Sequence, residues 1–144
     1  MERENQLKDL SQEHHDSLVL AKNIAAIAES GSDAELLEAI ERVKGYYKNE
    51  LEVHFQHEER TIFSLIFREY REHIALATTL LKEHGLIRLL IPKLTLENAK
   101  TDLAEFSEVL KNHTDVEEQK LFPLIESLFS DEQLDAVLNF VPLD

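Results

Sequence analysis

Residues 7–28 have the sequence LKDLSQEHHDSLVLAKNIAAIA, in which apolar side chains recur at steps of three and four residues. This spacing places them on one face of an α-helix, so the stretch predicts a long amphipathic helix. The members of the stripe are Leu7, Leu10, His14, Leu18, Ala21, Ala25 and Ala28. A helix with one such stripe packs that face against other helices, and the rest of the chain supplies them.

Breaks in the sequence divide the chain into further helices. Ser32 and Glu35 form a capping box that starts a second helix, Pro92 ends a third, and Ser130 starts a short last one. The turn between the second and third helices has no Gly or Pro and is inferred only from helix length. The predicted helices cover roughly residues 5–29, 33–68, 71–91, 96–129 (with Thr95 as its cap) and 131–140. Long amphipathic helices with short connections predict an all-α fold, an up-down antiparallel four-helix bundle with a short C-terminal helix.

Length, charge and composition limit the possible functions. The chain has 144 residues, so we expect residues 1–144 to form a single domain. The absence of cysteine excludes disulfides, thiolate metal sites and a thiol nucleophile. The formal charge of −14 repels nucleic acid and anionic membranes and attracts cations. No apolar run reaches the ~18 residues of a membrane span and the first residues do not resemble a signal peptide, so we expect a cytoplasmic protein without nucleic-acid or membrane partners.

The chain repeats itself at an offset of 59 residues. This offset aligns His54 with His113 and Glu58-Glu59 with Glu117-Glu118. Leucine coincidences are common in helical proteins, whereas matching histidines and paired glutamates at one offset are not. The repeat therefore predicts two related helical hairpins, and such a pair closes a four-helix bundle with pseudo-twofold symmetry.

The repeated residues have the spacing of metal ligands. Residues four apart on a helix share a face, so His54 and Glu58 project together, as do His113 and Glu117. Nitrogen and oxygen ligands without thiolates suit Fe, Mn or Zn, and a glutamate can bridge two ions ~3.5–4 Å apart. Two buried carboxylates without cations would cost several kcal/mol each, and we expect their burial to raise their pKa in the metal-free protein. The adjacent glutamates, Glu59 and Glu118, are candidates for supporting partners or alternative ligands.

The first and third predicted helices add histidines, and each leaves a choice open. His14 continues the apolar stripe, which favours it over His15, about 100° away on the helix. In the third helix the 59-residue offset favours His73. However, His84 lies as far beyond the preceding turn as His54 lies before it, about 15 residues or ~22 Å of helix. Depth along the bundle therefore favours His84.

Four motifs together resemble the hemerythrin-like, HHE cation-binding domains. They are Glu-His-His-x-x-Leu from residue 13, His-x-x-x-Glu-Glu from residue 54, Glu-His-x-x-Ile-Arg from residue 83, and His-x-x-x-Glu-Glu-x-x-Leu-Phe-Pro from residue 113. The resemblance spans nearly the whole chain and implies an up-down four-helix bundle with a non-haem di-iron centre. Carried over residue by residue, it implies that the ligands are His14 or His15, His54, Glu58, His84, His113 and Glu117.

One departure from the family bears on function. In the oxygen-carrying hemerythrins that this chain resembles, the third helix has the motif His-x-x-x-His. Here Arg88 stands four residues after His84, at the place of the second histidine. One iron then has fewer histidines, which favours sensing or redox chemistry over reversible oxygen storage. We expect a non-haem di-iron protein that binds or senses dioxygen, nitric oxide or peroxide, or handles iron, with Zn or Mn as other possible metals. A di-iron oxidoreductase and a metal-free acidic helical interaction module are the alternatives, and the sequence identifies no protein partner.

Overall fold

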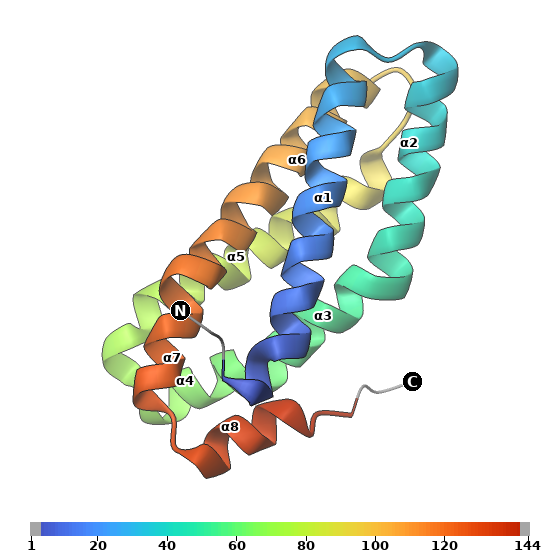
Figure 1. The fold of residues 1–144 in the computed structure, drawn as a ribbon. Coiled ribbons are helices and arrows are strands. Elements are labelled where there is room, and N and C mark those ends of the chain that lie inside the picture. The colour runs from blue at the N-terminus through green and yellow to red at the C-terminus, as the bar shows by residue number, and fades with distance from the viewer. Residues whose placement is uncertain (1–3, 142–144) are drawn as a thin grey trace.

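The structure is a computed structural model that describes residues 4–141. Within this range there is no β-strand, and four long helices form an elongated bundle with a short helix across one end (Figure 1). Successive long helices run in opposite directions along the bundle (Figure 1). The predicted all-α, up-down four-helix architecture is therefore confirmed. No described helix combines the length and the apolar character needed to cross a membrane.

Several of the long helices are composite. The first is the 3-10 turn η1 (Asn5–Leu7) followed by α1 (Lys8–Ser30). The second runs without a break through α2 (Asp33–Tyr46), η2 (Tyr47–Leu51), α3 (Glu52–His57), η3 (Glu58–Phe63) and α4 (Ser64–Glu69). The third is α5 (Ile74–Leu90) between the 3-10 turns η4 (Arg71–His73) and η5 (Ile91–Lys93). The fourth consists of α6 (Ala99–Val116), η6 (Glu117–Leu121) and α7 (Phe122–Leu128), and α8 (Asp131–Leu138) follows.

Most helix ends lie where the sequence places them. Ser32 and Ser130 both form complete capping boxes, each with a residue three positions later. The turn inferred from length lies at Tyr70, where the helical backbone is interrupted. The prediction that Thr95 caps the fourth helix is wrong. The amide of Asn98 donates to the Thr95 carbonyl at 3.2 Å and closes a turn first, so the helix begins only at Ala99.

Two apolar clusters fill the bundle, one toward each end, and each draws on all four long helices. One contains Phe55 and Phe106, and the other contains Phe63 and Phe122. Burial of each such side chain contributes about 1.5–3 kcal/mol. Between the clusters lies a layer of buried polar side chains, described below, which divides the hydrophobic core in two.

The short helix α8 closes the end of the bundle below the start of α1 (Figure 1). His57 Nε2 donates to the Val137 carbonyl at 2.6 Å, and its ring stacks on Phe140 with centroids 4.7 Å apart. Gln6 donates to Asp135 at 3.0 Å. His57 is thereby accounted for as a contact between the bundle and its C-terminal helix.

Candidate metal centre

Six polar side chains converge in the layer between the two apolar clusters. All are at least 95% buried, and all four long helices contribute to them. They form two groups, and within each group the possible ligand atoms lie within 4.8 Å of one another. The first group is His14, His54, Glu58 and Glu117, and the second is His84, His113, Glu58 and Glu117. The two glutamates are therefore common to both groups.

Glu58 faces both groups at once. Its Oε2 lies 3.3 Å from Nε2 of His14 and 3.3 Å from Nε2 of His54. Its Oε1 lies 3.1 Å from Nε2 of His84. One carboxylate oxygen is thus directed to each side, which is the arrangement a bridging carboxylate needs to serve two ions.

Glu117 also faces both groups, and its carboxylate oxygens lack hydrogen bonds from the described residues. His14 Nε2 lies 2.7 Å from its Oε1 and His113 Nε2 lies 3.1 Å from its Oε2. Neither contact has hydrogen-bond geometry, and both oxygens are buried without a hydrogen-bond partner among the described residues. A buried carboxylate without hydrogen bonds is costly. A cation bound between it and the imidazoles would remove that cost, so the residues fit a metal ion.

The second group also contains a close pair of ring nitrogens. Nε2 of His84 and Nε2 of His113 are 3.1 Å apart. Two nitrogens bound at about 2.1 Å to one ion, at right angles to each other, would lie about 3.0 Å apart. The separation is the one that two imidazoles sharing an ion would have.

Each of the four histidines is held from outside by a carboxylate. Nε2 faces the centre, and Nδ1 donates to an acidic side chain from a neighbouring long helix. The four pairs, at 2.6–2.8 Å, are His14–Glu118, His54–Glu13, His84–Glu59 and His113–Glu83. Such a bond fixes the ring orientation and leaves the inner nitrogen available to a metal.

Two of these outer carboxylates went unrecognised as supporting residues in the sequence. Glu13 and Glu83 each directly precede a histidine of the centre, yet each bonds to the histidine of a different helix. The sequence signal that could have identified them is the glutamate that directly precedes His14 and His84, one in each half of the chain. Glu118, by contrast, was recognised, and the structure places it outside both groups as the partner of His14.

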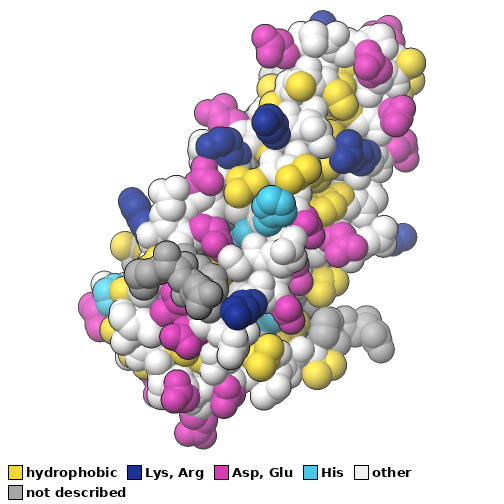
Figure 2. All heavy atoms as spheres, in the orientation of Figure 1, with side chains coloured by type: hydrophobic (Ala, Val, Ile, Leu, Met, Phe, Trp, Pro, Cys, Tyr) yellow, Lys and Arg dark blue, Asp and Glu magenta, His cyan; other side chains and the backbone are white. Residues whose placement is uncertain are grey.

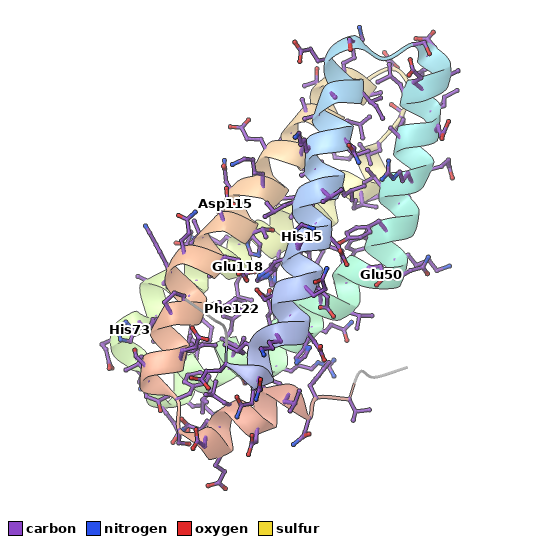
Figure 3. The ribbon with its side chains drawn as sticks, viewed as in Figure 1. His15, Glu50, His73, Asp115, Glu118 and Phe122 are labelled. Atoms are coloured by element: carbon purple, nitrogen blue, oxygen red, sulfur yellow. The ribbon has the colours of Figure 1, made fainter. Side chains whose placement is uncertain are left out.

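The structure distinguishes between the paired candidates of the first and third helices. His14 is 2% exposed and lies within the layer, whereas His15 is exposed on the outer side of α1 (Figure 3). His73 lies at the turn before α5, 31% exposed and 3.9 Å from Glu72 (Figure 3). His84, buried in α5, joins the second group. His14 and His84 are therefore brought to the centre, and His15 and His73 are not.

The two shared glutamates each begin a π-helical turn, η3 at Glu58 and η6 at Glu117. Residues five apart point about 140° apart in an α-helix, whereas the i→i+5 bond of a π-turn brings them to nearly the same side. As a result Phe63 and Phe122, five residues after the glutamates, also face the interior.

The two rings contact the histidines of the centre. Phe122 stacks on the His14 ring with centroids 4.9 Å apart, and Phe63 lies against the His84 ring at 5.6 Å. The turns at Glu58 and Glu117 therefore each place a glutamate in the centre and an aromatic ring against one of its histidines.

Opposed charges set the protonation of the layer in the metal-free protein. Burial by itself lowers the pKa of an imidazole, but at all four histidines the surrounding carboxylates outweigh it. The net result raises the pKa of His54 to about 9 and that of His113 to about 10. Burial likewise raises the pKa of Glu58, yet His54 and the other histidines bring it well below its usual value. The expectation of a raised carboxyl pKa is therefore wrong for Glu58, because imidazolium groups pair with it.

These shifts predict that the metal-free protein loses stability as pH rises from 6.5 toward 10. A histidine whose folded pKa is raised stabilises the fold fully below its unfolded pKa of about 6.5 and ceases to do so above its folded pKa. For His54 and His113 that loss falls between about pH 6.5 and pH 9 to 10. Thermal melts of the apoprotein followed by circular dichroism across this range will measure it. A melting temperature that is constant or rising from pH 6.5 to 9 would contradict the pairing.

Two hollows lie near the centre and differ in character. A cavity of about 320 Å³ is lined by the polar residues Glu13, Asp16, Ser17, Tyr46, Glu50 and the buried ligand candidate His54. A larger hollow of about 670 Å³ between α1 and α6 has mainly apolar walls and touches none of the six clustered residues. Acidic side chains are spread over the face of the molecule seen in Figure 2. The smaller cavity therefore combines three carboxylates with one of the six clustered residues in its lining.

Comparison with known proteins agrees with this geometry. The family model described as the hemerythrin HHE cation binding domain matches residues 5–125. No curated protein and no solved structure gives a significant match. The matched region contains all six clustered residues and most of the chain. The chain therefore belongs to the hemerythrin HHE cation-binding domain family.

Proposed function

We propose that this cation-binding domain holds a non-haem di-iron centre, with Zn or Mn as other possible metals. The observation that carries the proposal is that Glu58 and Glu117 belong to both groups of candidate ligands. Two separate mononuclear sites would not need shared carboxylates. We name the location between His14 and His54 the first metal position and that between His84 and His113 the second metal position.

The chain's own residues would divide the work of this centre as follows. Four Nε2 atoms would bind the metal, two at each position, and the two glutamates would bridge. Each position would receive two nitrogens and two carboxylate oxygens, fewer than the six ligands of an octahedral ion. An iron pair supplies a reversible change of oxidation state and free coordination positions for a small ligand. The outer carboxylates would hold each imidazole in the tautomer that leaves Nε2 unprotonated.

We further propose that the small molecule bound or sensed is dioxygen, nitric oxide or peroxide, or that the centre handles iron. The acidic cavity at His54 supports access by small polar species and cations. The apolar hollow between α1 and α6 does not touch the centre, so binding is favoured over oxidation of an organic substrate. The buried oxygens of Glu117 argue against a metal-free interaction module. A cytoplasmic location is part of this proposal.

The test is anaerobic reconstitution of the folded apoprotein with Fe²⁺, followed by elemental analysis. We expect close to two iron ions per chain and, after oxidation, absorbance from a ferric pair at wavelengths longer than those at which the chain's tyrosines and phenylalanines absorb. Trace metal only, in a protein that stays helical, would refute the proposal. A single tightly bound zinc would replace it with a mononuclear site.

Two histidine variants localise the result within the same experiment. His84→Ala is expected to remove at least one iron and its absorbance while helical content survives, because His84 lies in the second group. His73→Ala is the matched control on the same helical segment, since that side chain lies at the turn. It is expected to leave metal content unchanged. Loss of iron in the control alone would mean that the centre lies elsewhere.

A further inference from the structure

Arg88 makes a set of contacts just outside the second metal position. Its Nη1 and Nη2 donate to the two oxygens of Glu59 at 2.8 and 3.2 Å. Its Nε donates to both oxygens of Glu52 at 3.1 and 3.0 Å. A guanidinium that binds carboxylates in this forked manner restricts their orientation, which a lysine ammonium does not.

Two routes lead from Arg88 to His84. Glu59, held by the guanidinium, accepts from His84 Nδ1 at 2.7 Å. Phe55, whose ring centroid lies 5.4 Å from the Arg88 guanidinium carbon, stacks on the His84 ring at 3.9 Å. The arginine thus holds both the hydrogen-bond partner and the stacking partner of one histidine.

The internal repeat identifies the residue that corresponds to Arg88 in the other half of the centre. His14 and His84, on the first and third helices, are 70 residues apart, and the same step takes Arg88 to Leu18. Leu18 is uncharged and lines the apolar hollow between α1 and α6. An uncharged side chain therefore stands on the first helix at the place that corresponds to Arg88 on the third.

We propose that Arg88 is a positioning residue that fixes His84 through Glu59 and Phe55 and so tightens the second metal position. The proposal rests on the di-metal function proposed above.

Positioning and simple charge make opposite predictions. A positive charge near a cation site weakens cation binding, so removal of Arg88 would tighten the second position if charge were its main effect. If positioning dominates, removal frees Glu59 and His84 to reorient and weakens that position. Losses of outer partners of this kind cost about 10–100-fold in metal affinity.

The experiment titrates the full-length apoprotein with Co²⁺ in competition with a chelator. We expect wild type to bind two ions. In Arg88→Leu, which copies the residue at position 18, the second position is expected to bind about 10–100-fold more weakly while the first is unchanged. The Co²⁺ spectrum of the half-loaded variant should then match that of His84→Ala and differ from that of His14→Ala, which identifies the position that is lost.

Two further variants separate geometry from charge and from structure. Arg88→Lys keeps the charge but loses the fork, and we expect it to lose most of the affinity that Arg88→Leu loses. It also serves as the test if Arg88→Leu does not fold. Glu52→Gln leaves the pair between Arg88 and Glu59 intact, and its affinity should stay within about fivefold of wild type.

Several outcomes would overturn the proposal. They are equal weakening of both positions in Arg88→Leu, tightening of either position, or wild-type behaviour of Arg88→Lys. Wild-type protein that binds no Co²⁺ and no Fe²⁺ would instead refute the di-metal function, and this result is obtained before any variant is compared.

Discussion

Glu117→Gln is expected to abolish the binding of both metal ions at once. The two oxygens of Glu117 face different groups, with His14 2.7 Å from one and His113 3.1 Å from the other. An amide retains the shape of the side chain but loses the negative charge and one of the two oxygens, so it cannot bridge. Elemental analysis and chelator competition on the reconstituted variant measure the loss at both positions.

The matched control is Glu59→Gln, one residue after the other shared glutamate. Among the residues that the structure describes, Glu59 bonds only to the outer nitrogen of His84 and to Arg88. Its loss should therefore weaken one position by about 10–100-fold and leave the other occupied. If Glu117→Gln keeps one ion at wild-type affinity, Glu117 is not a bridge. If the two variants lose metal equally, the distinction between shared ligand and outer partner is wrong.

Saturating Fe²⁺ is expected to raise the melting temperature of the apoprotein by about 10–20 °C. An ion at 100 times its Kd stabilises the folded state by about 2.7 kcal/mol, so two ions contribute about 5 kcal/mol. A protein of this size gains about 2–4 °C for each kcal/mol. Anaerobic thermal melts followed by circular dichroism, with and without metal, measure the shift.

Glu117→Gln supplies the control for this measurement as well. Its melting temperature should not respond to Fe²⁺, because its two positions no longer hold the ions. An equal rise in wild type and variant would trace the stabilisation to adventitious binding at the acidic surface. No rise in wild type at saturation would mean that the layer between the apolar clusters is not where metal binds.

Much of the fold follows from local sequence signals. The capping boxes at Ser32 and Ser130 depend on residues three positions apart, so they can be recognised without knowledge of tertiary structure. The start of the fourth helix could not be recognised in this way. Threonine is a common cap residue, and only the structure shows that the Thr95 carbonyl forms a turn with Asn98 instead. Element type was therefore predictable, and this boundary was not.

The candidate site was predictable where a single helix determines it. The pairs His54 with Glu58 and His113 with Glu117 follow from helical periodicity alone, and they lie together in the structure. His84 required an argument about depth, because the helix pairs have different offsets: 59 residues between His54 and His113, and 70 between His14 and His84. The difference of eleven residues is about three helical turns, so His73 and His84 lie on the same face of the helix.

The outer carboxylates depend on how the helices are rotated against each other. Glu13 bonds to His54 and Glu83 bonds to His113, and each pair joins two different helices. Spacing within one helix carries no information on such a contact. The depressed pKa of Glu58 has the same origin, since it arises from three histidines on three helices. Sequence periodicity predicts only that Glu58 is buried, and from burial alone we expected a raised pKa.

The π-turns at Glu58 and Glu117 carry a consequence for how the chain can vary in length. Each turn holds one more residue than an α-helical turn would, so the helix beyond it is rotated by about 100° relative to an uninterrupted α-helix. In each of these two helices, the apolar face in the half that contains Phe63 and Phe122 is therefore rotated relative to the apolar face in the other half. Loss of one residue from a π-turn would restore regular helix and turn the apolar face of that helix, beyond the turn, toward solvent. In two of the four long helices, the number of residues between metal centre and core is as constrained as their identity.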